Sequence, residues 1–146
     1  QMVDASLFKL LQQAAKTSDP KGEKINIAVP PDNIPIFPIQ VQSIRRALIN
    51  LFTNAIRYAG KANVQIQIFD DHSEVIIDDN GPGIPRDKRD EVVLPFTRLD
   101  NSRNNETGGT GLGLSIAKNS ALNHGGELIL EDSPLGGLRV RLLLPL

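Results

Sequence analysis

The fold is decided by residues 40–59, which read QVQSIRRALINLFTNAIRYA. With Asn50 placed at zero and about 100° allowed for each residue, one side of a helix collects large apolar side chains between about 100° and 200°. These are Leu48, Leu51, Phe52 and Ala55. Asn54 and Arg57 fall at about 40° and 340°, on either side of Asn50. The pattern predicts a long amphipathic helix that buries its apolar side and carries two carboxamides and a guanidinium on the other.

The polar side of this helix has the chemistry of a Mg²⁺ and phosphate site. Carboxamide oxygens are hard ligands that suit Mg²⁺, which combines few protein ligands with waters and phosphate oxygens. The guanidinium of Arg57 is suited to hold a phosphate. Asparagine is a poor helix former, so the pair at Asn50 and Asn54 needs a reason. A solvated polar face with an Asn–Asn pair is the alternative, and the helix alone does not exclude it.

A second candidate stretch, Asp78-Asp79-Asn80-Gly81-Pro82-Gly83-Ile84, ends a strand-like run. Its glycines let a flat ligand come close to the backbone. An ionised carboxylate only accepts hydrogen bonds, so it can receive one from an exocyclic amine such as that of adenine. The alternative is a plain turn at the end of a strand.

A third stretch, Gly108-Gly109-Thr110-Gly111-Leu112-Gly113-Leu114, opens a predicted helix. Backbone N–H groups at a helix start attract phosphate, and glycines leave the backbone exposed. No Lys-Ser or Lys-Thr pair follows, which excludes the P-loop pattern, and the third glycine has the wrong offset for a Rossmann dinucleotide-binding turn. A flexible linker is the alternative. The polar residues 99–110 predict a mobile segment.

The remaining periodicities predict helices that alternate with antiparallel hairpins. The helices are expected over 3–16, 86–94 and 112–124, and the strands over 25–29, 64–68, 75–78, 128–131 and 138–144. Turn-forming residues lie at 70–71 and 134–137, and a proline-rich loop at 30–38. We expect an α+β fold, a two-layer sandwich of a mixed, mostly antiparallel sheet with about three helices on one face.

The composition is ordinary for a globular protein and excludes several classes. The 146 residues are 40% hydrophobic and 23% charged, with a net charge of −1, so the basic excess of a nucleic-acid-binding protein is missing and no nucleic-acid partner is expected. Without cysteine, disulfides and thiolate metal ligands are excluded. No apolar run approaches the ~20 residues that span a bilayer, so no membrane insertion of these residues is expected. We expect one domain over 1–146, and Gln1 in place of Met suggests a piece of a longer protein.

Taken in order with Leu94-Pro95-Phe96-Thr97-Arg98-Leu99-Asp100, the three stretches resemble the histidine-kinase branch of the ATPase superfamily that includes gyrase, Hsp90 and MutL. Residues 50–55 resemble the N box of that family, and 79–84 its G1 box. Residues 94–100 resemble the F box, which favours the kinases over the other branches, and 109–114 resemble the G2 box. The resemblance covers nearly the whole chain. It implies a Bergerat-type ATP-binding fold with ATP and Mg²⁺ as cofactors and ADP as the product.

The resemblance implies a role at the nucleotide for each matching residue. Asn54 would ligate Mg²⁺ with help from Asn50, and Arg57 would contact phosphate. These three are the expected catalytic residues. Tyr58 would lie against the nucleotide, and Asp79 would accept the adenine amine.

The glycine-rich boxes and the F box would complete the cofactor site. Gly81 and Gly83 would shape the adenine pocket, next to Ile84. Phe96 would anchor a mobile lid, and Arg98 is a candidate for contact with the γ-phosphate or for a domain interface. The phosphates would be wrapped by the G2 residues Gly109, Thr110, Gly111, Leu112 and Gly113.

The phosphoacceptor motif of the family, a histidine followed by an acidic residue on a helical hairpin, is missing from this sequence. His72 falls in a predicted hairpin turn and His124 at the end of a predicted helix, so both are expected to be structural or solvated. The resemblance therefore implies that the chain donates the γ-phosphate of ATP to a histidine on a separate dimerisation hairpin, expected before residue 1.

By the same resemblance, the parent protein is a homodimeric inner-membrane sensor of a two-component system, with this domain in the cytoplasm and a response regulator downstream. Two alternatives stay open at this point. One is an ATP-driven clamp of the gyrase or MutL branch. The other is a nucleotide-sensing module without transfer activity.

Overall fold

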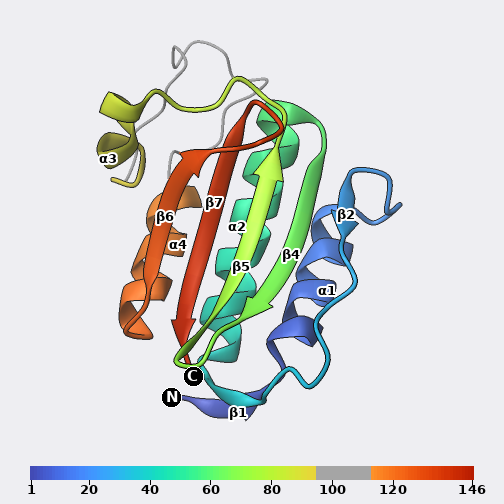
Figure 1. Ribbon diagram of the computed structural model, residues 1–146, viewed down its shortest axis with the longest axis vertical. Coiled ribbons are helices and arrows are strands. Elements are labelled where there is room, and N and C mark those ends of the chain that lie inside the picture. Colours follow the sequence, from blue (N-terminus) through green and yellow to red (C-terminus); the bar gives the residue numbers. More distant parts are fainter. Residues whose placement is uncertain (95–112) are drawn as a thin grey trace.

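The structure is a computed structural model that describes residues 1–94 and 113–146 (Figure 1). The described strands are β1 (Val3–Ala5), β2 (Ile25–Ile27), β3 (Phe37–Ile39), β4 (Ala62–Ile68), β5 (His72–Asp79), β6 (Glu127–Asp132) and β7 (Leu138–Pro145). The described helices are α1 (Leu7–Ser18), α2 (Val41–Ala59), α3 (Arg89–Val92) and α4 (Gly113–Asn123), with a 3-10 turn at Arg86–Lys88.

The main sheet has five strands in the order β2-β4-β5-β7-β6. β2 runs parallel to β4, and the other neighbouring strands of this sheet are antiparallel. In Figure 1, α2 and α4 lie behind the sheet, and α1 packs against α2. A separate ribbon pairs β1 with β3. The predicted α+β sandwich, with a mostly antiparallel sheet covered by helices on one face, is confirmed.

The core lies between α2 and the sheet and follows the predicted side of the helix. All four predicted core residues of α2 are buried, and Phe52 is fully enclosed. Val75 and Ile77 of β5 belong to the same cluster. Burial of a side chain as large as Phe52 stabilises the fold by about 1.5–3 kcal/mol. The helix ends where Gly60 takes a left-handed conformation and donates its N–H to the carbonyl of Ile56 at 2.9 Å.

The first helix begins later than predicted because Ser6 caps it. The Ser6 Oγ accepts the backbone N–H of Lys9 at 3.2 Å, which fixes the helix start at Leu7. The residues before the cap form β1 and pair with β3, inside the segment predicted as a proline-rich loop. Pro38 is tolerated there because a two-stranded ribbon has no central ladder to break. The predicted helical start at residue 3 is therefore wrong, and so is the assignment of residues 37 and 38 to a loop.

The other boundaries agree with the predictions to within a few residues. The predicted helix over 86–94 is reduced to a 3-10 turn and the single turn α3. The last helix is described from Gly113 onward, and the predicted mobile segment 99–110 lies outside the described residues. In the part of the chain that the structure describes, no helix has both the length and the apolar character needed to cross a membrane.

Candidate functional site

The polar side of α2 is partly buried and contains an unsatisfied donor. Asn50, Asn54, Arg57 and Tyr58 are each partly buried, within little more than two turns of the helix. The Nδ2 amide nitrogen of Asn50 is buried and has no hydrogen-bond partner among the described residues. Leaving such a donor unpaired costs about 1–3 kcal/mol unless a ligand satisfies it. The donor, two carboxamide oxygens and a guanidinium together fit a ligand that combines phosphate oxygens with a hard metal ion.

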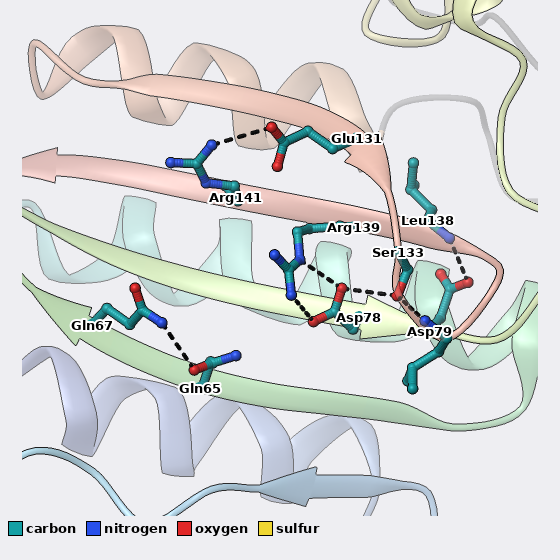
Figure 2. Close-up of polar contacts among 10 residues, drawn as sticks. Gln65, Gln67, Asp78, Asp79, Glu131, Ser133, Leu138, Arg139 and Arg141 are labelled. Carbon is teal, nitrogen blue, oxygen red and sulfur yellow. Dashed lines mark hydrogen bonds and ion pairs between the residues drawn. The ribbon is translucent and has the colours of Figure 1, made fainter.

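Asp79 ends β5 and is buried, with 7% of its surface exposed. Its Oδ1 accepts the N–H groups of Gly81 and Leu138, both at 3.0 Å (Figure 2). Its Oδ2 accepts no hydrogen bond from the described residues, and no cation among them pairs with this carboxylate. The backbone thus fixes one oxygen and leaves the other to an N–H donor of a ligand.

The turn that follows β5 is wedged between two other segments. A Cβ on Gly81 would lie 2.9 Å from the Cβ of Ala59, at the end of α2. Gly83 has a φ of +70°, and a Cβ there would lie 3.4 Å from the carbonyl oxygen of Gly137. Ile84 packs against the hydrophobic core. Close approach requires glycine at position 81, and the left-handed backbone favours it at position 83.

The start of α4 meets the polar side of α2. A Cβ on Gly113 would lie 3.8 Å from the carbonyl oxygen of Asn50 and 4.0 Å from its Cβ. The middle of α2 therefore contacts the start of α4, and the end of α2 contacts the turn after β5. The other predicted F-box and G2-box site residues lie outside the described residues: Phe96, Arg98, Gly109, Thr110, Gly111 and Leu112.

Arg89 of α3 holds the turn after β5 from another side, and sequence reasoning missed it. Its Nε donates to the carbonyl oxygen of Ile84 at 3.0 Å, and its Nη2 pairs with Asp132 at the end of β6. An arginine shortly after a turn is common on protein surfaces, so the sequence carried no signal for this contact.

Sequence reasoning also missed Gly137 and Leu138, which it treated as a plain turn and the start of a strand. Both lie against Asp79. A signal was available in the pair Gly136-Gly137. The turn needs one residue in the left-handed region, and Gly136 supplies it with a φ of +100°. The second glycine has no such role in the turn.

Asp78 points to the opposite face of the sheet from Asp79, as successive strand residues do. Arg139 donates to both of its carboxylate oxygens, at 2.8 and 2.9 Å, and the Ser133 Oγ donates to Oδ1 at 2.9 Å (Figure 2). These hydrogen bonds from Arg139 raise the pKa of the guanidinium above its usual value. Asp78 is occupied by protein groups, which makes it a structural residue.

Both histidines are engaged in structural contacts. His124 accepts the backbone N–H of Gln40 at 3.0 Å through Nε2. Its Nδ1 donates to the carbonyl oxygen of Ser120 at 2.7 Å, because a carbonyl can only accept. His72 bonds to Asp71 at 2.6 Å, and this bond is the main reason that the pKa of His72 is raised. Neither histidine lies on a helical hairpin.

Residues 39–146 match the family model described as "Histidine kinase-, DNA gyrase B-, and HSP90-like ATPase". The chain is 37% identical over 139 residues to the sensor histidine kinase CpxA of Escherichia coli (strain K12), a match that covers 94% of this chain and 30% of CpxA. It is 32% identical over 142 residues to the sensor-type histidine kinase PrrB of Mycobacterium leprae (strain TN), covering 96% of this chain and 31% of that protein. The chain thus spans about a third of the length of these relatives.

Among solved structures, the ATP binding domain of PrrB from Mycobacterium tuberculosis is similar over 99% of this chain and 97% of its own. The TM-score is 0.78 and the sequence identity 28%. The region matched by the family model contains α2, β5 and α4, the three elements that form the candidate site. The chain therefore belongs to the family of histidine kinase-, DNA gyrase B- and HSP90-like ATPases.

Proposed function

We propose that this chain binds Mg-ATP and donates the γ-phosphate to a histidine on a separate dimerisation domain, as the catalytic domain of a sensor histidine kinase. The observation that carries the proposal is the buried Asp79, whose Oδ1 is fixed by two backbone N–H groups while Oδ2 accepts no hydrogen bond from the described residues. Membership of an ATPase family supports ATP as that ligand. The sensor histidine kinases among its relatives favour transfer to histidine over an ATP-driven clamp.

Adenine suits the end of β5 because its exocyclic amine is a hydrogen-bond donor. Since Asp79 pairs with no cation among the described residues, its charge is free to strengthen that bond. Charge-assisted hydrogen bonds are roughly twice as strong as neutral ones. Guanine would instead place a carbonyl oxygen against the carboxylate, and two acceptors would face each other. The site therefore favours adenine nucleotides.

The polar side of α2 is where we place Mg²⁺ and the phosphates. Asn54 and Asn50 would hold the ion through their carboxamide oxygens, and Arg57 would hold phosphate. The unpaired Nδ2 of Asn50 fits this assignment, since it can donate to a phosphate oxygen or to a water of the ion. When bound, Mg²⁺ neutralises charge on the phosphates. The start of α4 at Gly113 adds backbone N–H groups beside Asn50.

Phosphoryl transfer needs mainly positioning and neutralisation of charge, and we assign both to this chain. The nucleophile is an imidazole nitrogen on a helical hairpin elsewhere in the parent protein. We place the parent in a membrane as a homodimeric sensor, with this domain in the cytoplasm. The phosphoryl group would then pass to a response regulator.

Calorimetric titration of ADP and ATP, with and without Mg²⁺, tests the pocket. Asp79→Asn is expected to weaken binding about 10- to 100-fold, the range for a hydrogen bond to a charged group. Asn54→Ala is expected to remove the dependence on Mg²⁺. Asp78→Asn is the matched control, because it makes the same change one residue earlier on the other face of the sheet and leaves binding intact. A folded wild-type chain that binds neither nucleotide would sink the proposal.

Transfer is tested by adding a purified helical hairpin domain of a sensor histidine kinase such as CpxA, with ATP labelled on its γ-phosphate. Acid-labile label on the hairpin is expected, and none on a hairpin whose histidine is replaced by alanine. If binding is intact and no hairpin is labelled, the transfer step is wrong. Dimerisation on a sizing column that depends on ATP would then favour the clamp.

A further inference from the structure

The turn between β6 and β7 lies directly against Asp79. A Cβ on Gly137 would lie 2.2 Å from the Asp79 Oδ1 and 2.6 Å from both the Asp79 carbonyl oxygen and the Gly81 nitrogen. Real Cβ atoms do not make contacts this short, and two of these three atoms belong to the backbone, which cannot yield cheaply. Position 137 has no room for a side chain as long as Asp79 keeps its place.

The next residue, Leu138, adds a direct contact to the carboxylate. Its N–H donates to the Asp79 Oδ1, and the antiparallel register that pairs Asp78 with Arg139 holds the two residues opposite each other (Figure 2). Gly81 donates to the same oxygen from the turn after β5. Hydrogen bonds depend steeply on distance and angle, so two donors on one oxygen also fix the direction of the other oxygen.

The turn is closed by its own hydrogen bonds, which do not involve Asp79. The Ser133 N–H donates to the Gly137 carbonyl, and the Gly136 N–H donates to the Ser133 carbonyl, both at 2.9 Å. The Ser133 Oγ ties the turn to Asp78. Gly136 provides the left-handed residue, and a Cβ on it would meet nothing within 4 Å. The reason for glycine at position 137 is therefore its close approach to the Asp79 carboxylate and to the backbone of Asp79 and Gly81.

We propose that Gly137 and Leu138 are positioning residues for Asp79, which hold its carboxylate at the place and angle that select adenine by its exocyclic amine. The inference rests on the proposed function, because Asp79 selects an amine only if the chain binds adenine nucleotides. A methyl group at position 137 displaces the carboxylate or the turn. The proposed contacts of α2 and α4 with the phosphates lie elsewhere, so the loss falls on the adenine end of the site and mostly on the amine.

The test uses two ligands that differ only in this amine, ADP and purine riboside 5′-diphosphate. Calorimetry on the folded chain gives the ratio of their Kd values. The wild-type chain is expected to prefer ADP about 10- to 100-fold. In Gly137→Ala the ratio is expected to fall to within about threefold of one, with the Kd of the purine riboside diphosphate changed less than the Kd of ADP. Gly136→Ala is the matched control: it lowers Tm because its φ is left-handed, and it keeps the wild-type ratio.

A second variant covers the case in which Gly137→Ala does not fold. Ser133→Ala removes the anchor of the turn without adding an atom beside Asp79, and it is expected to lower the ratio severalfold. A folded Gly137→Ala chain with the wild-type ratio overturns the inference, as does an unchanged ratio in Ser133→Ala when Gly137→Ala is unfolded. A wild-type chain that binds both ligands equally overturns the role of Asp79 itself. The wild-type measurement therefore distinguishes a failure of the proposed function from a failure of the positioning role of Gly137 and Leu138.

Discussion

Asp78 and Asp79 are neighbours in β5 and both are buried, yet they belong to two different regions of the molecule. Asp78 faces the outer side of the sheet, where Arg139 and Ser133 give it three hydrogen bonds. Asp79 faces the helix side and receives two backbone N–H groups on one oxygen, with no cation among the described residues. Burial of a carboxylate therefore does not identify a ligand site. A buried oxygen without a hydrogen-bond partner among the described residues is the stronger indication of such a site.

The outer side of β5 continues this contrast along the strand. Glu74 pairs with Arg141, and Asp78 pairs with Arg139. These four residues, here called the outer row, cover Ile76, which is buried but outside the core cluster. In Figure 2 the two arginines lie along the outer face of the sheet. Each buried charge there meets a cation, and the arginine stems cover apolar surface. The outer side is saturated by protein groups, whereas the helix side ends in a carboxylate with one oxygen that accepts no hydrogen bond from the described residues, and we propose that a ligand completes it.

The largest expected effect is a difference in the free energy of unfolding between Asp78→Ala and Asp79→Ala. Asp78→Ala leaves Arg139 and Ser133 without their partner, and we expect a loss of about 3 kcal/mol in the free energy of unfolding, at the low end for a broken buried pair because Arg139 is partly exposed. Asp79→Ala removes a buried charge that has no cationic partner among the described residues, along with its two hydrogen bonds, so we expect a loss of only about 1 kcal/mol. Urea denaturation of both variants measures the difference.

The same two variants are expected to rank in the opposite order by the stability that a nucleotide adds. Saturating ADP stabilises any folded chain that binds it, by about 2.7 kcal/mol at a concentration of 100 Kd. We expect most of this gain to remain in Asp78→Ala, which loses only the Ser133 anchor of the turn, and most of it to be lost in Asp79→Ala. Equal destabilisation by the two substitutions, or an equal gain from ADP, would remove the distinction between a structural and a ligand-binding carboxylate.

A smaller effect is expected further along the outer row, at Glu74. This carboxylate is almost fully buried and pairs with Arg141, whose pKa it raises. Arg141 keeps a second partner in Glu131 at 3.3 Å when Glu74 is removed. We therefore expect Glu74→Ala to cost about 2 kcal/mol, less than Asp78→Ala. A matched Arg141→Met variant should cost more, because it leaves the buried Glu74 carboxylate without its arginine, and a double-mutant cycle would give their coupling. Independent, additive effects would show that the pair contributes nothing.

Much of the fold was predictable because its signals are local. The apolar side of α2, the strand alternation and the glycine stop after α4 depend on residues a few positions apart. Two predictions failed where a local contact of another kind decided the structure. Ser6 caps α1 and releases residues 3–5 into a strand, and Pro38 is tolerated in a ribbon that has no central strand.

The candidate site was only half predictable, because its second half depends on strand register. Sequence patterns indicated Asn54 and Asp79 through residue type and spacing. Leu138 reaches Asp79 only because β7 pairs with β5 across 59 positions of the chain, and no periodicity encodes that register. The surroundings of Asp78 and Asp79 could not be predicted for the same reason. The alternation of a strand predicts that they face opposite sides, but not which side holds Arg139.

The smallest expected effect lies at the start of β5, where His72 extends the outer row. Its ring bonds to Asp71 at 2.6 Å and lies 3.5 Å from Glu74, and these contacts, Asp71 first, raise the pKa of His72. A histidine whose folded pKa exceeds its unfolded value of about 6.5 contributes stability that is fully present below about pH 6.5. That contribution is lost as the pH rises through the folded pKa. The free energy of unfolding is expected to fall with pH over this window more in the wild-type chain than in His72→Gln.

Denaturation between pH 5.5 and 8.5 measures the difference between the two proteins. The lower bound avoids Asp71, whose pKa is lowered mainly by the same bond and whose contribution is lost only as the pH falls toward its usual acidic range. Added salt should shrink the difference, because Asp71 is exposed. A slope in His72→Gln equal to that of the wild type would mean that the outer row ends at Glu74. A slope in His72→Gln smaller than that of the wild type would extend the outer row to His72, the first residue of β5. Asp79 would then be the one acidic residue of this strand that has no cationic partner among the described residues.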